Sequence, residues 1–277
     1  MYNIYQTIIN NNDSLCYKES HMTIQIAIAN QKGGVGKTTT ALALADQLQV
    51  RGKRVLLIDC DPQRNSSTVY RAKIDNTATL YDIMMSDYKA SQCIQHTDYG
   101  DIIACDTMLR NADTEVKGGR SKYTRLQKAV NGVLSNYDFV IYDTPPHSGI
   151  LLENVLMTTD YLVCPIQCDS YSIHGIQDFR ETISEYFDEN PRLKILGLLK
   201  NRYKGRQSLT RSLEEETLPL IAEQIGTTVF KATIRDSVKS AEAAALGIPL
   251  SKYKEAKAIA EDYGQLTDEI LSMIGEK

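Results

Sequence analysis

The chain has 277 residues and a net charge of −4, which excludes a nucleic-acid binder that is basic over its whole surface but leaves room for a local basic patch. Apolar residues make up 42% of the chain, so a sizeable core can form without disulfides. No apolar run approaches the roughly 18 residues of a transmembrane helix, and the N-terminus lacks the basic and apolar segments of a secretion signal.

Residues 1–22 are polar and match no motif, and we expect a flexible N-terminal arm there, with leader sequence before a second possible start at Met22 as the alternative. No internal repeat, low-complexity tract or linker interrupts the rest, so residues 23–277 are expected to form one domain. The six cysteines lie mostly in apolar runs, which favours buried thiols over a disulfide framework. The pair Cys164 and Cys168 could also suggest a metal or Fe–S site, but no other Cys or His group converges on it.

Short apolar runs alternate with helical patterns, and this alternation predicts an α/β fold: a doubly wound, mainly parallel sheet flanked by helices on both faces. The predicted strands are Thr23–Ala29, Arg54–Asp59, Asp101–Cys105, Asp138–Asp143, Tyr161–Pro165 and Leu193–Leu199. Their continuous apolar character is typical of strands buried between two layers of helices. The predicted helices are Lys37–Arg51, Tyr123–Leu134, Ser208–Ile225 and Tyr253–Ile274.

A glycine-rich segment between the first predicted strand and helix has the composition of a phosphate-binding loop. Gln31 replaces the first glycine of the standard pattern G-x-x-x-x-G-K-[ST], whereas the deviant pattern K-G-G-x-G-K-[ST] is met in full. The glycines allow backbone N–H groups to converge on phosphate oxygens, and the helix N-terminus adds partial positive charge. The segment predicts a site for ATP and Mg²⁺ in which Lys37 reaches the β- and γ-phosphates and Thr38 binds the metal. The predicted nucleotide-binding residues of the loop are Gly33, Gly34, Val35, Gly36, Lys37, Thr38 and Thr39.

Three aspartates follow predicted strands. Asp59 and Asp61 lie at and just beyond the end of one strand, and Asp143 ends another. Ligands of open α/β sheets bind beyond the carboxyl ends of the strands, and a carboxylate there suits a contact to Mg²⁺, usually through water. A lone aspartate could equally be a helix cap or turn residue, but three beside a phosphate loop favour the metal site.

These segments resemble the ParA/MinD group of ATPases, and ParA-type partition proteins most closely. The matching stretches are Asn30–Thr40, Val55–Asn65, Tyr137–Pro146, Pro165–Gly175 and Lys231–Pro249, and the resemblance spans about residues 23–260. It implies a P-loop NTPase fold, ATP hydrolysis and a homodimer that forms on ATP binding. With only about 22 residues before the first strand, the chain resembles the small class, which leaves operator binding to a partner protein.

The resemblance also implies roles for individual residues. Lys32 is similar to the signature lysine, which crosses the ATP-sandwich dimer to the nucleotide of the other subunit. Asp61 matches the aspartate that orients the attacking water, Asp59 sits at the neighbouring position near the metal, and Asp143 matches the second carboxylate motif. Asn201 is similar to the asparagine that reads adenine, with a simple turn residue as the alternative.

Two groups of basic residues are candidates for contact with DNA. Arg235 and Lys239 are four residues apart on a predicted helix, so both are expected to face one way. A solvated surface is the alternative, but the resemblance favours DNA contact for this pair. The other group is less favoured and consists of Arg202, Lys204, Arg206 and Arg211.

The resulting hypothesis is a cytoplasmic, nucleoid-associated partition ATPase that segregates a plasmid, a chromosome or a mobile element. Its expected partners are non-specific DNA and a ParB-like centromere-binding protein that triggers hydrolysis. One alternative is a MinD-like ATPase on a membrane, but no membrane partner is expected because the C-terminal segment is net acidic. Another is a ParA-like protein that positions a protein assembly, which the sequence does not separate from DNA segregation.

Overall fold

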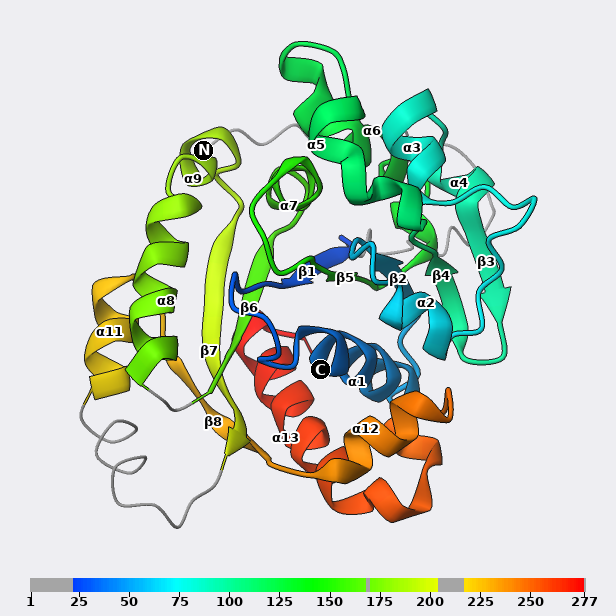
Figure 1. Cartoon of the computed structure of the whole chain (residues 1–277). Helices are drawn as coiled ribbons and strands as arrows, with labels where there is room; N and C mark the ends of the chain where they lie inside the picture. The colour runs from blue at the N-terminus through cyan, green and yellow to red at the C-terminus, as the bar shows by residue number, and fades with distance from the viewer. Residues whose placement is uncertain (1–21, 168–169, 204–216, 277) are drawn as a thin grey trace, which may run out of the picture.

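The computed structural model describes residues 22–167, 170–203 and 217–276. The predicted N-terminal arm lies outside these residues, apart from its last residue, Met22. The described residues form an α/β structure in which one central sheet is covered by helices on both faces (Figure 1). This confirms the fold class predicted from the alternation of strands and helices.

The sheet has eight strands in the order β3-β4-β2-β5-β1-β6-β7-β8. All pairings are parallel except that of β3 with β4, which is antiparallel. The chain therefore winds outward in both directions from β1, and the loops on either side of β1 meet at the carboxyl edge of the sheet. The strands are β1 (Ile24–Ile28), β2 (Val55–Asp59), β3 (Ile94–Thr97), β4 (Gly100–Ile103), β5 (Phe139–Asp143), β6 (Tyr161–Ile166), β7 (Lys194–Tyr203) and β8 (Val229–Arg235).

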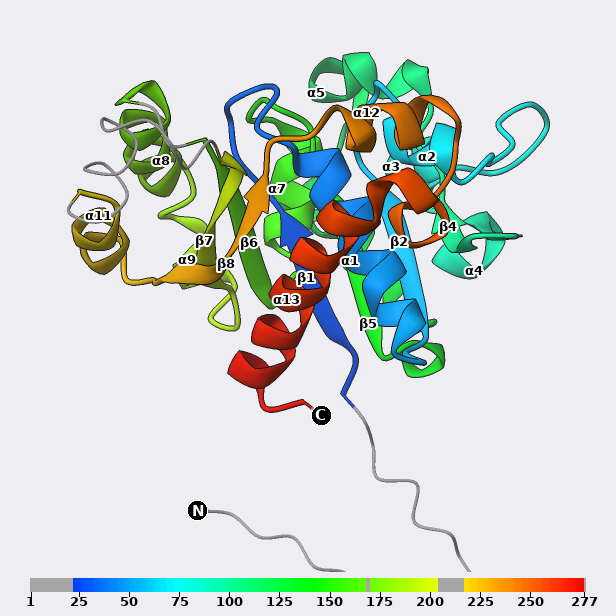
Figure 2. The same ribbon diagram turned by 90° about the horizontal axis from the view of Figure 1, so that it is seen from below.

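The helices divide between the two faces of the sheet. Helices α1, α12 and α13 cover one face, and Figure 2 shows α13 beside α1 in front of the sheet. Helices α3, α6, α7, α8 and α11 pack on the other face. The helices are α1 (Lys37–Val50), α2 (Asn65–Val69), α3 (Leu80–Ser86), α4 (Ala90–Cys93), α5 (Ala112–Glu115), α6 (Arg125–Val130), α7 (Ile150–Leu156), α8 (Ser170–Thr182), α9 (Tyr186–Glu189), α11 (Leu218–Gln224), α12 (Val238–Ala245) and α13 (Lys257–Ile274).

Two apolar layers hold these helices to the sheet. Successive side chains of a strand point to opposite faces, so Ile26 and Ile28 join the layer under α1 and α13, while Ala27 and Ala29 join the other layer. All five residues of β2 and of β5 are buried. The continuous apolar runs of the sequence are therefore explained by helices on both sides of the central strands.

The sequence predictions missed the two outermost strands. β8 alternates buried Phe230, Ala232 and Ile234 with more exposed residues, because this strand at the end of the sheet buries one face. β3 is short and polar and pairs only with β4. The central strands were identified because they are apolar on both faces. β3 and β8 are not apolar on both faces, so the sequence pattern did not predict them.

The helix predictions were right in place but differed in extent. α6 covers only Arg125–Val130 of the predicted helix Tyr123–Leu134, with 3-10 helices on either side of it. α13 begins at Lys257 rather than Tyr253, after two short 3-10 helices. Part of the predicted helix Ser208–Ile225 lies outside the described residues, and α11 forms its later part.

Candidate nucleotide and metal site

The loop between β1 and α1 is fixed at its start by two side-chain amides. Asn30 Nδ2 donates a hydrogen bond to the carbonyl of Pro165 in β6, at 2.8 Å. Gln31 Nε2 donates to the hydroxyls of Ser148 and Thr182, at 2.7 and 3.0 Å. Gln31, which replaces the first glycine of the standard pattern, therefore ties the loop to the segment after β5 and to α8.

The next turn of the loop needs glycine and is braced from β7. Gly34 and Gly36 have φ values of 75° and 93°, in the left-handed region that favours glycine. A Cβ on Gly36 would lie 2.1 Å from Nδ2 of Asn201. That amide is buried, donates to the carbonyl of Val35 at 2.8 Å, and accepts from the backbone N–H of Arg202 at 2.8 Å. Asn201 thus packs directly against the loop.

Lys37 begins α1 with a buried side chain, 7% exposed. Its Nζ donates a hydrogen bond to the carbonyl of Lys32, 3.1 Å away across the loop. Burial lowers the pKa of Lys37, and the negative charges of Asp143 and Asp61 act in the opposite direction. The loop therefore curls around the ammonium group of Lys37, which lies close to the carboxylates of Asp143 and Asp61.

Asp59 and Asp143 end two neighbouring parallel strands as register partners, and both side chains are fully buried. Asp59 Oδ2 accepts hydrogen bonds from the backbone N–H and the hydroxyl of Ser67, at 2.8 and 2.6 Å. Its Oδ1 accepts from the backbone N–H of Asp61 at 3.1 Å. Burial is the main cause that raises the pKa of Asp59. Both oxygens of Asp59 therefore hold the start of α2 and the turn before it.

Asp143 is only half satisfied. Its Oδ2 accepts from the hydroxyl of Ser66 at 2.8 Å, whereas Oδ1 is buried with no hydrogen-bond partner in the described part of the chain. Burial and then the negative charge of Asp59 raise its pKa, and the nearby hydroxyls of Ser66 and Thr38 act in the opposite direction. A buried carboxylate oxygen without a partner, beside the Thr38 hydroxyl, is a ready position for a cation or its bound water.

Asp61 lies in the turn between β2 and α2. Its side chain is 8% exposed, and Oδ1 accepts from the backbone N–H of Gln63 at 2.9 Å. Through its own N–H it is also fixed to Asp59. The structure therefore brings Asp59, Asp61 and Asp143 together with Lys37, as the sequence predicted from three aspartates after strands beside a phosphate-binding loop.

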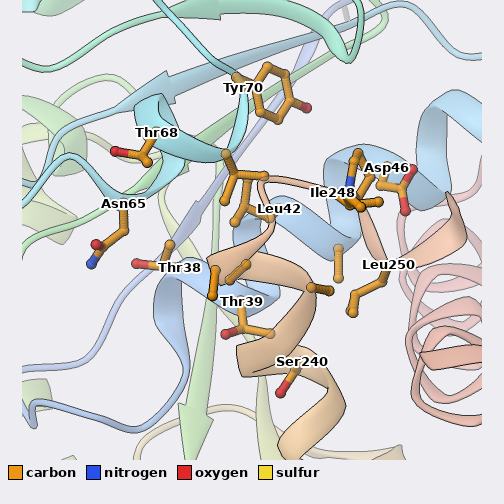
Figure 3. Close-up of a pocket in the computed structure, with 16 residues that line it drawn as sticks. Thr38, Thr39, Leu42, Asp46, Asn65, Thr68, Tyr70, Ser240, Ile248 and Leu250 are labelled. Carbon is orange, nitrogen blue, oxygen red and sulfur yellow. The ribbon is translucent and has the colours of Figure 1, made fainter. Parts of the chain in front are cut away.

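A hollow of about 400 Å³ opens next to the threonines that follow Lys37 (Figure 3). Thr38, Thr39 and Leu42 of α1 form one wall, α2 supplies Asn65, and α12 supplies Ser240. Much of the remaining lining is apolar, from the alanines of α12 and the turn that follows it. The start of α1 is thus flanked by open space rather than by packed side chains.

The residue types fit Mg²⁺ bound together with a phosphate ligand. Thr38 supplies a hydroxyl and Asp143 supplies the oxygen without a partner, both oxygen ligands of the kind that Mg²⁺ prefers. Within residues 22–167, 170–203 and 217–276, no three His, Cys, Asp or Glu side chains form a metal-binding group. The remaining ligands would therefore have to come from phosphate oxygens and water, as is usual for this ion.

The prediction that Arg235 and Lys239 share one face of a helix is wrong. Arg235 ends β8, and its guanidinium makes two 2.7 Å hydrogen bonds to the carboxylate of Asp262 in α13. Lys239 lies in α12, whose N-cap is Ser237, and pairs with Glu242 at 2.7 Å. The alternating pattern of β8 continues through Arg235, so strand and helix meet between the two basic residues.

Two further predictions fall partly outside the described residues. Of the second basic group, Arg202 pairs with Asp236 at 3.3 Å, while Lys204, Arg206 and Arg211 lie outside the described ranges. Of the cysteine pair, Cys164 is buried and free, as expected, and Cys168 lies outside. Cys60, Cys93 and Cys105 are likewise buried and free.

Sequence reasoning missed Ser66 and Ser67, whose hydroxyls hydrogen-bond Asp143 and Asp59. The signal was their position directly after the segment Asp61–Asn65, in the first turn of α2. Asn30 was also present in the recognised stretch, but its role as an anchor of the loop depends on Pro165, which is distant in sequence.

The sequence comparisons agree on one protein family. The family model described as AAA domain matches residues 23–195. The chain is 33% identical to the chromosome partitioning protein ParA of Caulobacter vibrioides over 253 residues, covering 89% of this chain and 93% of that protein. It is 35% identical to the sporulation initiation inhibitor protein Soj of Bacillus subtilis over 249 residues, covering 88% and 97%.

Solved structures share the fold. Cobyrinic acid a,c-diamide synthase from Mycobacterium smegmatis, with bound ATP analogue and magnesium, matches with a TM-score of 0.75 at 26% identity, covering 91% of this chain and 96% of that one. Cyanothece McdA in complex with ATP matches with a TM-score of 0.78 at 21% identity, covering 93% and 98%. The second likeness concerns the fold alone, since the identity is low.

Proposed function

Because the chain belongs to the ParA/Soj family of P-loop ATPases, we propose that it is a DNA-partition ATPase. In this proposal it binds ATP with Mg²⁺, forms an ATP-sandwich homodimer and binds DNA on the nucleoid without sequence preference. A ParB-like centromere-binding protein stimulates hydrolysis and so releases the dimer, and repeated cycles segregate a plasmid, chromosome or mobile element. The observation that carries the proposal is the convergence of Lys37, Thr38 and the half-satisfied Asp143 at the carboxyl edge of the sheet.

The nucleotide phosphates would be held by the backbone of Gly33–Thr39 and by Lys37. The hydrogen bond of Lys37 to the carbonyl of Lys32 is weaker than one to a phosphate, since a charged acceptor strengthens a hydrogen bond. Thr38 and Asp143 would hold Mg²⁺, with Asp59 as a support that fixes the neighbouring turn rather than as a ligand. When bound, the ion neutralises charge that develops on the phosphates.

The base would be read by Asn201, which lies near the end of β7 beside Gly36. Its amide uses one N–H on Val35 and one oxygen lone pair on Arg202. The Asn201 side chain also hydrogen-bonds to the hydroxyl of Tyr263, but the amide oxygen has a second lone pair, so in this proposal Asn201 braces the loop and contacts adenine through that oxygen. The brace and the base contact are thus compatible in this proposal.

Hydrolysis would depend on Asp61 and on Lys32. Asp61 is fixed by hydrogen bonds on both sides of its turn, which suits a group that must orient a water molecule. Lys32 lies on the same loop as Lys37 and is only partly buried, so its ammonium could extend to the nucleotide of a second subunit. The site of one subunit would then be completed by its partner.

The structure argues against the MinD-like alternative in one respect. α13 is the expected place for a membrane-binding helix, yet its apolar side, including Ile259, Leu266 and Ile270, is buried against the sheet and α1. An interfacial helix must bury that side in lipid instead. In the part of the chain that the structure describes, no helix is long and apolar enough to span a membrane.

The proposal is tested by DNA binding as a function of nucleotide. The full chain is mixed with a random-sequence duplex in the presence of ATP and Mg²⁺, ADP and Mg²⁺, or no nucleotide, and binding and phosphate release are measured. We expect binding with ATP only, and faster phosphate release when DNA and the centromere-binding partner are added. Equal DNA binding under all three conditions, or no hydrolysis of ATP, would contradict the proposal.

A further inference from the structure

An aromatic ring beside the antiparallel strand pair gathers basic side chains from two distant segments. The guanidinium of Arg71, just after α2, lies 5.4 Å from the ring centre of Tyr99, in the turn between β3 and β4. The ammonium of Lys252, after α12, lies 5.0 Å from the same ring. Tyr70 packs edge-on against Tyr99, with ring centres 6.5 Å apart. The ring thus positions two cations by cation–π contact.

A third cation joins this group across a hollow of about 400 Å³. Lys73 lines the hollow together with Tyr99 and His96, and its backbone is held by two 2.8 Å hydrogen bonds to the side chain of Gln95 in β3. The segment after α2 is therefore fixed to the edge strand. We call Arg71, Lys73 and Lys252 the Tyr99 cation cluster.

The charge of this cluster is not neutralised by ion pairs. Across residues 22–167, 170–203 and 217–276, no acidic side chain forms an ion pair with Arg71, Lys73 or Lys252. Asp98 is the carboxylate that lines the same hollow, and Asp101 is engaged with His96 at 2.6 Å. The cluster thus places three cations, without an ion-pair partner in the described part of the chain, on one surface of a protein whose net charge is −4, with the carboxylates of Asp75 and Asp98 nearby.

The basic residues that the sequence predicted to contact DNA are, by contrast, already paired with carboxylates. Arg235 is engaged by both carboxylate oxygens of Asp262, and Lys239 pairs with Glu242. A cation that is already paired with a carboxylate must break that pair, or share it, before it neutralises a phosphate. The cations of the Tyr99 cation cluster are exposed. Within the described residues they have no ion pair to break before they neutralise a phosphate.

The cluster is continuous with the end of α12. The guanidinium of Arg71 lies against the turn at Gly247, where a Cβ would be 3.8 Å from Nε. Figure 1 shows α2, the β3–β4 pair and the chain after α12 on the same side of the molecule. A long, regularly charged partner could therefore contact this surface without entering the nucleotide site.

We propose that the Tyr99 cation cluster contacts the phosphate backbone of duplex DNA, an assignment that rests on the proposed function. The spacing of phosphates along a duplex suits several cations on one surface, and each neutralised phosphate releases counterions. A cluster of this kind carries no information about base sequence, as non-specific binding requires. An ATP-dependent dimer would present the cluster twice on one particle.

The test uses the full chain with ATP and Mg²⁺ and a random-sequence duplex, titrated at several salt concentrations. The variants are Lys73→Ala, Lys252→Ala and Arg71→Asn, the last because Arg71 has φ 54° and asparagine tolerates that conformation. Lys194→Ala is the matched control: it removes an exposed lysine at the start of β7, toward the opposite edge of the sheet. Light scattering with ATP confirms that each variant still dimerises.

We expect each cluster variant to weaken binding equally for all sequences and to reduce the slope of log K against log salt by about 0.9 for each phosphate that the variant no longer neutralises. Lys73→Arg and Lys252→Arg should bind like the wild type, and Lys194→Ala should change neither quantity. If the wild type binds DNA with ATP but the cluster variants match Lys194→Ala, the cluster does not bind DNA and the proposed function stands. If the wild type fails to bind DNA with ATP, both the cluster assignment and the proposed function are wrong.

Discussion

Asp59 and Asp143 face each other as register partners at the ends of β2 and β5, with both carboxyl groups fully buried. Two carboxylates in one buried place repel each other and lose hydration, and both effects disfavour ionisation. Hydrogen bonds satisfy Asp59, while one oxygen of Asp143 has no partner in the described structure. The pair therefore favours the cation of an incoming nucleotide complex.

The first prediction follows from this pair and concerns the nucleotide-free protein in a chelator. Burial raises the pKa of Asp143 to about 8. A group whose pKa is raised on folding contributes stability below its ordinary pKa, and this contribution is lost as pH rises through the raised value. The free energy of unfolding should therefore fall between about pH 4 and pH 8, and Asp143→Asn should flatten that fall.

Urea unfolding across this pH range measures the effect, and Asp138→Asn is a control because Asp138 has a lowered pKa next to Arg54. In Asp143→Asn, Mg²⁺-dependent ATP turnover should also fall. A variant with the pH dependence of the wild type would show that Asp143 is not buried with a raised pKa.

The second prediction concerns the close approach of Gly36 to Asn201. Gly36→Ala places a methyl group 2.1 Å from the Asn201 amide at a φ of 93°, so the loop or the amide must move. We expect destabilisation by about 1–3 kcal/mol and loss of ATP binding in calorimetry. Gly33→Ala is the matched control for stability, because its Cβ meets no atom within 4 Å. Equal melting temperatures for the two variants would contradict the close packing of this loop.

The third prediction gives Arg235 a structural role. The side chain of Asp262 is 7% exposed, and Arg235→Ala removes both guanidinium hydrogen bonds to its carboxylate, leaving only the bond from the backbone N–H of residue 235 at 3.0 Å. We expect a loss of about 1–3 kcal/mol in the free energy of unfolding. Lys239→Ala should cause no measurable loss, since its partner Glu242 is exposed. If Arg235→Ala unfolds like the wild type yet loses DNA binding, the DNA contact predicted from the sequence is its main role.

The fourth prediction separates ATP binding from hydrolysis. Asp61→Ala should bind ATP and accumulate as a dimer, because the phosphate loop is unchanged, while phosphate release falls by roughly 10² or more. Asp61→Asn keeps a side-chain acceptor for the Gln63 N–H and controls for the turn. Turnover near the wild-type rate in both variants would assign the positioning of water to another residue.

The sequence predicted the centre of the fold well because the central strands carry their own signal. Runs that are apolar on both faces, such as the five buried residues of β5, have one simple explanation in a sheet covered by helices. The phosphate loop was equally readable, since its glycines and Lys37 stand in a fixed order. β8 was not predicted, because it alternates Phe230, Ala232 and Ile234 with more exposed residues and is followed closely by a helix.

The local sequence pattern did not predict interactions between segments that are distant in the chain. That Arg235 is held by Asp262 depends on how α13 crosses β8, and that Asn201 braces the loop depends on the order of strands in the sheet. The Tyr99 cation cluster joins Arg71 and Lys252, which are far apart in the chain. Such pairs follow from tertiary packing and not from local propensity.

The most direct test of the account is the mass of the particle in solution, measured by light scattering with and without ATP and Mg²⁺. The wild type should double its mass with ATP. Lys37→Ala should stay a monomer and bind no ATP in calorimetry, because the buried ammonium proposed to meet the β- and γ-phosphates is lost. Lys32→Ala should bind ATP and yet stay a monomer, since its proposed target lies on the other subunit. A Lys32→Ala protein that still doubles its mass with ATP would contradict the sandwich dimer at the centre of this account.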